Sequence, residues 1–413
     1  MEGLNRRQLL ARTGVALAAA GFADLEDVTA APAADASLGW DAVRAQFRLS
    51  RGLIHMGGLY LASHPGPVRR AIDRHRRGLD ADPVGYLHAK GDALEAAVLR
   101  QAGAYLRARP VDIALTDSTT MGLGLLYAGL RLGAGQEVVT TTHDFYATHE
   151  SLRLAAERSG ASVRRVTLYR NPGRATEAEI VDSLVRAVGP STAVVALTWV
   201  HSGTGVKLPV ATIAQALRDR GRPLLCVDGV HALGVEPVDV GALGCDFLVA
   251  GCHKWLFGPR GTGFVWGRSS AWPRARPTIP AFSGGSPARD LTPGGFHSFE
   301  HRWALAEAFR FHSQIGKGRV TARIHALNRR LKAGLASMSH VRLVTPASDA
   351  VSAGIVVFSV DRLSPGAVVA ALRRRRIVAT ETPYSPSFPR LAPGLLNTPG
   401  EVDRVLAAVR ALR

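Results

Sequence analysis

The chain has 413 residues, of which 46% are hydrophobic, and a formal net charge of +18 at pH 7. This length and composition predict a globular protein with one large core and a second, smaller one. The charge permits binding to nucleic acid, but the arginines are spread along the chain without an aromatic and basic recognition module. We therefore expect no nucleic-acid partner.

Residues 1–36 resemble a twin-arginine export signal. Arg6 and Arg7 precede a short apolar run at 15–23, and residues 31–33 offer a small-residue cleavage site. The pattern predicts export to the periplasm or the exterior; an unprocessed extension on a cytoplasmic protein is the alternative. No run of 18 or more apolar residues follows, so we expect no membrane-spanning helix and no membrane partner.

From about residue 39, short apolar, β-branched runs alternate with amphipathic runs of roughly ten residues. This alternation predicts βαβ units and a mainly parallel sheet with helices on both faces, which is an α/β fold. Catalytic groups are then expected at the carboxyl ends of the strands. The predicted strands are 111–116, 137–142, 162–169, 192–200, 223–230 and 247–254, and the predicted helices are 121–133, 150–160, 177–189 and 212–221.

The stretch 270–300 is rich in proline and glycine and interrupts the alternation. We place a domain boundary there, which gives a large domain at 37–285 and a smaller α+β domain at 286–413. In the smaller domain, the sequence predicts one long amphipathic helix at 304–338, a strand at 351–360 and a terminal helix at 401–413.

The three cysteines, Cys226, Cys245 and Cys252, lie in apolar contexts and lack metal-ligand spacing. Their odd number argues against a disulfide framework, so we expect buried, unpaired thiols and no metal site.

Lys254 is one of only five lysines among 51 basic residues, and it follows the predicted strand that ends near Gly251. Its amine would therefore project from the carboxyl end of a strand. A partly desolvated lysine can lose its proton and form a Schiff base, which arginine cannot do. The alternative is an ordinary loop lysine.

Asp228 ends another predicted strand, and His231 follows three residues later. A carboxylate in this position can pair with a protonated pyridine nitrogen, as pyridoxal phosphate (PLP) requires. The alternative is an aspartate that caps the next helix. In the segment 116–124, hydroxyl residues stand where a strand meets a helix, and such a junction can bind a phosphate.

Five motifs together resemble the class V aminotransferase family of fold type I PLP-dependent enzymes, and most of all its isopenicillin N epimerase-like branch. They are DSTT, HDFYA, SGTG, VDGVHALG and GCHKWLFGPRGTG, and the resemblance extends over roughly residues 40–413. It implies a mainly parallel sheet of the seven-stranded type, PLP as cofactor, an amino-acid substrate and a homodimer with sites at the subunit interface.

The resemblance also assigns roles to individual residues. Lys254 would form the internal aldimine, Asp228 would pair with the ring nitrogen, and Arg390 would clamp a substrate carboxylate. His201 would contact the substrate. The other residues implied in cofactor binding are Ser118, Thr119, Thr120, Phe145, Tyr146, Ser202, His231 (also implied in catalysis) and His253.

Three departures from the family pattern accompany these matches. Gly251 stands where relatives often have a phosphate-binding serine, and the His201-Ser202 pair replaces two residues that line the site. The glycine-threonine pair that supplies a phosphate ligand from the neighbouring subunit is not evident, and we consider His301 or Arg302 as its substitute.

Several reactions stay open at this point. Epimerisation fits the resemblance and would use Lys254 on one face of Cα and His201 or Tyr146 on the other. Aminotransfer, C–S or C–C lyase action and oxygen-dependent decarboxylation are alternatives, as are a sugar aminotransferase and a non-catalytic basic binding protein. Desulfurase chemistry is disfavoured because no cysteine follows Cys252.

Overall fold

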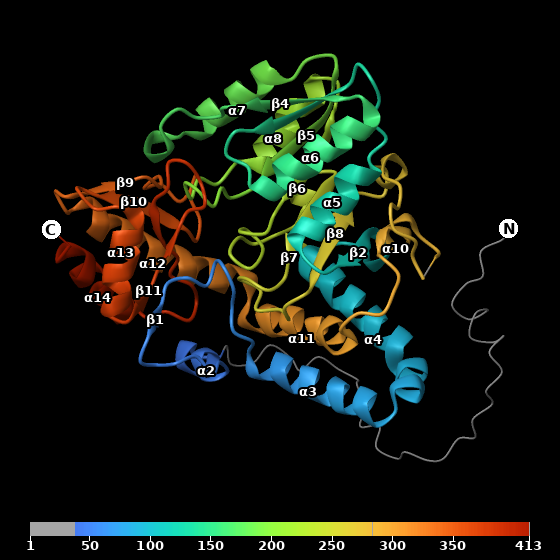
Figure 1. The fold of residues 1–413 in the computed structure, drawn as a ribbon, viewed down its shortest axis with the longest axis horizontal. Helices are drawn as coiled ribbons and strands as arrows, with labels where there is room; N and C mark the ends of the chain where they lie inside the picture. The colour runs from blue at the N-terminus through green and yellow to red at the C-terminus, as the bar shows by residue number, and fades with distance from the viewer. Residues whose placement is uncertain (1–37, 283, 413) are drawn as a thin grey trace.

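The computed structural model describes residues 38–282 and 284–412 (Figure 1). The predicted export signal therefore lies outside the described residues. The described chain contains a seven-stranded sheet, a four-stranded antiparallel sheet and a two-stranded parallel sheet. No helix in this part of the chain is long and apolar enough to cross a membrane.

The seven-stranded sheet has the strand order β2-β8-β7-β6-β5-β3-β4. Only β8 runs antiparallel to its neighbours. Each predicted strand from 111 to 254 is present, whereas β8 is not among the predicted strands. The bounds are β2 Ile113–Thr116, β3 Glu137–Thr141, β4 Ser162–Val166, β5 Thr192–Thr198, β6 Leu224–Asp228, β7 Phe247–Gly251 and β8 Gly263–Gly267.

Alternate residues of the central strands pack into two separate cores, as the pleat of a strand requires. Val195 and Val227 belong to the core on one face, and their neighbours Val194 and Cys226 belong to the core on the other. Both faces are therefore buried, which explains why these strands are apolar throughout.

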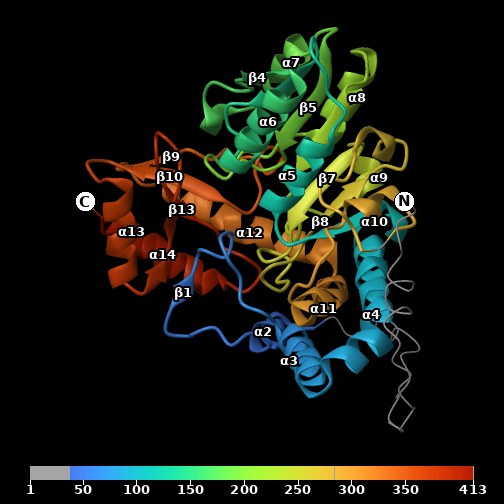
Figure 2. The same ribbon diagram turned by 45° about the vertical axis from the view of Figure 1, so that its right-hand side comes forward.

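A different group of helices covers each face of this sheet (Figures 1 and 2). α5 (Thr119–Gly129), α6 (Tyr146–Ser159) and α10 (Pro287–Leu291) contribute to one core. α4 (Pro83–Leu106), α7 (Glu177–Ala187), α8 (Val210–Ala216) and α11 (Phe299–Ile315) contribute to the other. The remaining short helix of this region is α9 (Val240–Leu243).

The prediction of one helix across 304–338 is wrong. α11 ends at Ile315, and α12 (Lys317–Ala336) begins after Gly316, whose φ of 93° lies where glycine is favoured over other residues. α11 packs against α3 (Gly66–Ala81) and α4, whereas α12 packs against β9 and α14. At this break the chain therefore passes from the region of the seven-stranded sheet into the C-terminal region.

The C-terminal region combines the four-stranded sheet β12-β13-β10-β9 with α12, α13 and α14 around a third core. Short β1 adds to β11, and α2 precedes it near the start of the described chain. The bounds are α2 Trp40–Ala45, β1 Ile54–His55, β9 Val341–Leu343, β10 Val356–Val360, α13 Pro365–Arg374, β11 Ile377–Val378, β12 Thr380–Glu381, β13 Pro389–Leu391 and α14 Pro399–Arg410. The division into domains at residue 285 stays a prediction.

Candidate active site

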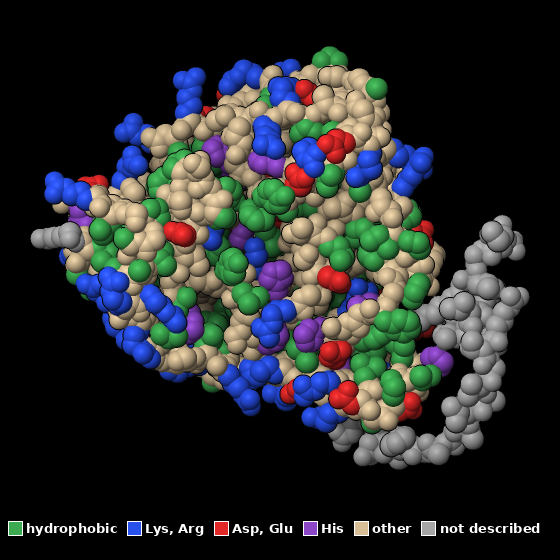
Figure 3. Space-filling view, viewed as in Figure 1, with side chains coloured by type: hydrophobic (Ala, Val, Ile, Leu, Met, Phe, Trp, Pro, Cys, Tyr) green, Lys and Arg blue, Asp and Glu red, His purple; other side chains and the backbone are tan. Residues whose placement is uncertain are grey.

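A cavity of about 280 Å³ lies at the carboxyl ends of β6 and β7. One wall comes from these strands and the start of α5, and the other comes from the segment that joins β12 and β13. Figure 3 shows histidine side chains gathered near the middle of this face of the molecule. Lys254, Asp228 and Arg390, which the sequence places far apart, all line this one cavity.

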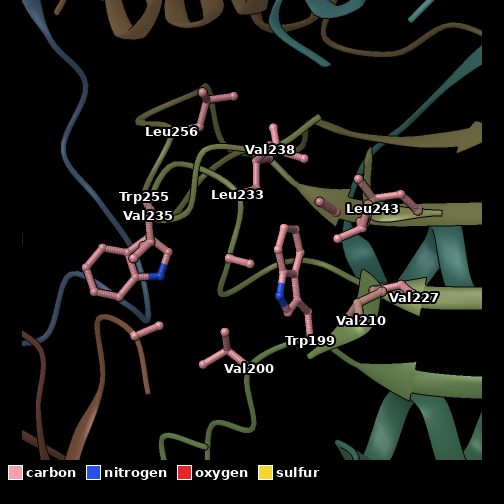
Figure 4. Packing of buried hydrophobic residues seen from close by; sticks show 14 of the residues in the cluster. Trp199, Val200, Val210, Val227, Leu233, Val235, Val238, Leu243, Trp255 and Leu256 are labelled. Atoms are coloured by element: carbon pink, nitrogen blue, oxygen red, sulfur yellow. The ribbon is translucent and has the colours of Figure 1, made fainter. Parts of the chain in front are cut away.

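Lys254 lies three residues beyond the end of β7 and is held there by its neighbour Trp255. The Trp255 side chain is buried and packs with Val235 in the core beside the loop (Figure 4). Two glycines, Gly354 and Gly394, leave room for its ring, since an added Cβ would stand 2.9 and 3.4 Å from it. The tryptophan therefore anchors the loop that presents the lysine.

The pKa of Lys254 is lowered to about 8: burial lowers it most, the charge of Asp228 raises it in part, and the charge of Arg390 lowers it. A neutral amine is the nucleophilic form of lysine. This environment therefore makes the reactive form far more abundant near neutral pH than it is for an exposed lysine.

Asp228 is the last residue of β6 and is 2% exposed. Its pKa is raised to about 6 because burial outweighs the lowering effects of a hydrogen bond from the Val230 backbone N–H to Oδ1 at 3.0 Å and of the charge of Lys254. The alternative role as a helix cap does not hold, because no helix begins within the next several residues. The carboxylate is available for a cationic partner in the cavity.

His231 lies beside the lysine, with Nε2 3.4 Å from the Lys254 Nζ. Burial, and next the charge of Lys254, lower the pKa of His231 well below its ordinary value, so the ring is neutral. Its Nδ1 is buried without a hydrogen-bond partner among the described residues, as is Oγ1 of Thr198 on the same cavity. Such atoms call for a polar ligand.

The start of α5 forms the anion-binding end of the cavity. Ser118 is the N-cap, and its side chain accepts a hydrogen bond from the Met121 backbone N–H. Thr119 Oγ1 accepts one from the Gly251 N–H at 2.8 Å. A Cβ on Gly251 would lie 2.9 Å from that oxygen, so Thr119 occupies the space that a serine would need. Thr120 and His253 also line this part of the cavity.

Arg390 enters the cavity from β13 and is 4% exposed. Its Nε donates to Thr380 Oγ1 at 3.0 Å, Nη1 to the Ser202 carbonyl at 3.0 Å and Nη2 to the Glu381 carbonyl at 3.3 Å. Since a guanidinium carries five N–H groups, one remains on each Nη. These two can bind a carboxylate in the bidentate manner.

Of the residues implied by the resemblance, Phe145 lies in the cavity, whereas Tyr146 and His201 do not. Phe145 lines the cavity and meets the Tyr384 ring edge-on at 6.4 Å. Tyr146, at the first position of α6, is 68% exposed and does not line the cavity. His201 is fully buried and lines a neighbouring chamber instead. Neither Tyr146 nor His201 is thus brought together with Lys254.

The residues of the cavity that were not predicted from the sequence include four with polar side chains: Tyr60, His143, Thr198 and Tyr384. The Tyr384 hydroxyl lies 2.7 Å from Ser202 Oγ, a contact between residues 182 positions apart. No local pattern signals such a pair. His143 stands inside the HDFYA motif and could have been singled out there, although its ring stacks on Tyr169 at 4.1 Å.

Arg302 and His301 stand at the start of α11. Arg302 Nη2 lies 3.4 Å from Asp117 Oδ1, next to the N-cap of α5, and His301 Nδ1 lies 3.0 Å from the Arg260 carbonyl. Neither lines the cavity. Their role as a substitute phosphate ligand stays a hypothesis.

The three cysteines are all buried and unpaired, as predicted. Burial raises the pKa of each thiol above its ordinary value. No group of acidic, histidine or cysteine side chains in the described residues could hold a metal ion.

The described geometry fits PLP. A lysine with a lowered pKa, a buried carboxylate, a helix N-terminus for the phosphate and two unpartnered polar atoms share one cavity.

Among solved structures, the fold is similar to the cystine C–S lyase C-DES in complex with cysteine persulfide, with a TM-score of 0.81 and 22% identity over 87% of this chain and 98% of that one. A C-DES mutant with glycine covalently linked to its PLP cofactor gives a TM-score of 0.83 at 22% identity, over 89% and 99% of the two chains. This is the fold of the fold type I PLP-dependent enzymes, as predicted.

The aminotransferase class-V family model matches residues 99–382, so the chain belongs to this family and is a PLP-dependent enzyme. It is 29% identical over 401 residues to isopenicillin N epimerase of Streptomyces clavuligerus, covering 90% of this chain and 98% of that protein. It is also 27% identical over 394 residues to a cysteine desulfurase of Klebsiella pneumoniae, covering 87% and 93%. The resemblance inferred from the motifs is thereby confirmed.

Proposed function

We propose that this enzyme epimerises an α-amino acid at Cα by removing a proton and returning one to the opposite face. The proposal rests on one observation above all: Lys254, Asp228 and Arg390 line a single cavity. Bound PLP supplies an electron sink for the carbon that loses the proton.

Each of these side chains has a distinct task. Arg390 holds the substrate carboxylate through its two free N–H groups and so fixes the orientation of Cα. Asp228, which is charged above its pKa of about 6, balances the positive ring nitrogen of the cofactor. Lys254, with a pKa of about 8, is suited to take and return a proton near neutral pH.

Tyr384 is our candidate for the second proton donor, in place of His201 or Tyr146. It lines the cavity, and its hydroxyl is hydrogen-bonded to Ser202. Burial raises the pKa of Tyr384, so the phenol keeps its proton and can donate it. The similarity to isopenicillin N epimerases over 90% of the chain supports this choice of reaction.

Desulfuration by a cysteine persulfide route is the less favoured assignment, although cysteine desulfurases are among the relatives. Such chemistry needs an exposed thiolate. Every cysteine of this chain is buried and has a raised pKa.

Incubation of the holoenzyme with single amino acids in deuterium oxide tests the reaction. We expect deuterium at Cα, slow loss of optical purity and no net conversion, as followed by mass spectrometry and chiral chromatography. A keto acid, a sulfur-containing product or oxygen-dependent loss of the carboxylate would instead assign an aminotransferase, a lyase or an oxidase. Tyr384→Phe should slow deuterium exchange into the enantiomer whose Cα proton faces Tyr384 more than exchange into the other enantiomer, by roughly ten-fold or more.

We further propose a homodimer and export of the folded protein. Three apolar side chains in the segment before α11 are exposed, namely Ile279, Phe282 and Phe296, and the rings of Phe282 and Phe296 lie 6.4 Å apart. An apolar patch of this kind supports contact with a second copy. Export is supported only by the arginine pair and apolar run of residues 1–36.

A further inference from the structure

A second, larger chamber of about 620 Å³ adjoins the active-site cavity. His143 and Tyr384 line both spaces, so the two are neighbours. The chamber lies between the seven-stranded sheet and the four-stranded sheet, since its walls include Arg170 beyond β4 and Arg342 in β9. Its size suits a ligand larger than the side chains of most amino acids.

The chamber carries positive charge without a balancing acid. Arg170 and Arg342 line it, whereas none of its lining residues is Asp or Glu. Within the part of the chain that the structure describes, neither guanidinium forms an ion pair or a side-chain hydrogen bond. Two unpaired cations on one concave wall favour an anionic ligand.

The rest of the wall is a fixed mixture of apolar and neutral polar groups. Leu343, Pro386 and Phe388 supply apolar surface. His201 is held by the Tyr169 hydroxyl at 2.9 Å from Nδ1, and the same hydroxyl lies 2.8 Å from Thr204 Oγ1. Burial lowers the pKa of His201 to about 3, so the ring adds hydrogen-bonding capacity but no charge.

We propose that this chamber is a subsite for the side chain of the substrate, and that it selects amino acids whose side chain is a long apolar stem ending in a carboxylate or similar anion. The amino-acid head would lie in the inner cavity on Arg390, the stem would pass His143 and Tyr384, and the anionic end would meet Arg170 and Arg342. This assignment rests on the proposed function, because it needs an α-amino acid in the inner cavity.

The order of the charges along this path explains why one enzyme would carry cations in both spaces. Arg390 is buried and fully oriented by backbone and hydroxyl partners, as recognition of an invariant carboxylate requires. Arg170 and Arg342 are exposed and unrestrained, so they can adjust to the length of the stem. Arg390 therefore fixes the position of the reacting carbon, while Arg170 and Arg342 bind the anionic end of the substrate side chain.

The test uses the holoenzyme and a series of amino acids that differ only in the far end. Aspartate, glutamate and homologues with one to three further methylenes are compared with uncharged amino acids of equal length. Dissociation constants come from the change in the visible absorbance of the cofactor, and from calorimetry on Lys254→Ala, which cannot turn the ligand over. We expect affinity to rise with stem length only in the acidic series.

Arg342→Gln, alone or combined with Arg170→Gln, should lower the affinity for the longest acidic ligand by roughly ten-fold or more. The affinity for the uncharged ligands should stay unchanged. Arg158→Gln removes an exposed arginine outside the chamber and is the matched control. It should change neither series.

The possible failures are separable. If amino acids perturb the cofactor spectrum but acidic and uncharged series bind alike, the subsite is refuted and the proposed function stands. If a dicarboxylate without an amino group binds as tightly as the matching amino acid and depends equally on Arg342, the chamber is a separate anion site and the substrate assignment is overturned. If no amino acid perturbs the spectrum, the proposed function fails, and this subsite fails with it.

Discussion

The two walls of the active-site cavity hold their charged residues by different means. On the wall of β6 and β7, Asp228 and Lys254 are placed directly by strand ends, and burial moves both pKa values towards neutrality. On the wall of β12 and β13, Arg390 is held by three hydrogen bonds, two of them to backbone carbonyls. In the function we propose, Lys254 on the first wall takes the proton, while the second wall holds the carboxylate on Arg390 and offers Tyr384 as the second proton donor.

The two walls also belong to different sheets. Asp228 ends β6 and Lys254 follows β7, and both strands lie inside the seven-stranded sheet. Arg390 lies in β13 of the four-stranded antiparallel sheet and Tyr384 in the segment that joins β12 and β13, and both are hydrogen-bonded to Ser202, which follows β5.

The largest effect should follow from Lys254→Arg, which keeps the positive charge but removes the titratable amine. We expect the characteristic visible absorbance of the cofactor to be lost and activity to fall by roughly four orders of magnitude, because the proton-transfer group and the covalent anchor disappear together. Lys90→Arg, at an exposed site in α4, is the control and should be neutral. Substantial residual turnover in the variant would refute the role of the first wall.

Arg390→Lys should act on the second wall only. Lysine lacks the planar fork, so the bidentate grip on the carboxylate is lost. We expect KM to rise by roughly ten-fold or more while the cofactor absorbance stays unchanged, and thermal unfolding would show whether the fold persists. Arg330→Lys, at an exposed pair with Asp403, serves as control. Unchanged kinetics would point to a substrate without a carboxylate, such as an amino sugar.

The same contrast explains what could be predicted from the sequence. Asp228 and Lys254 were found because each directly follows an apolar strand, and the order of strands alone brings their ends to one edge of the sheet. Arg390 was found only through the resemblance, since no local rule brings β13 to the cavity. Tyr384 and the outer chamber were missed because they depend on packing between distant segments. The single long helix predicted across Gly316 failed because periodicity continues through a glycine whose positive φ ends the helix.

The smallest and most specific effect concerns the titration of Lys254 in the cofactor-free protein. Its amine should react with an acylating reagent with a pH midpoint of about 8, measured by mass spectrometry of the Lys254 peptide. At that pH Asp228, with a pKa of about 6, is ionised, and its negative charge stabilises the ammonium. Asp228→Asn should therefore lower the midpoint. Arg390 repels the ammonium, so Arg390→Gln should raise it. Asp182→Asn, an exposed change in α7, should leave the midpoint in place. Opposite shifts from the two walls would establish that both charges act on one amine across the cavity; an unchanged midpoint in both variants would mean that burial alone tunes it.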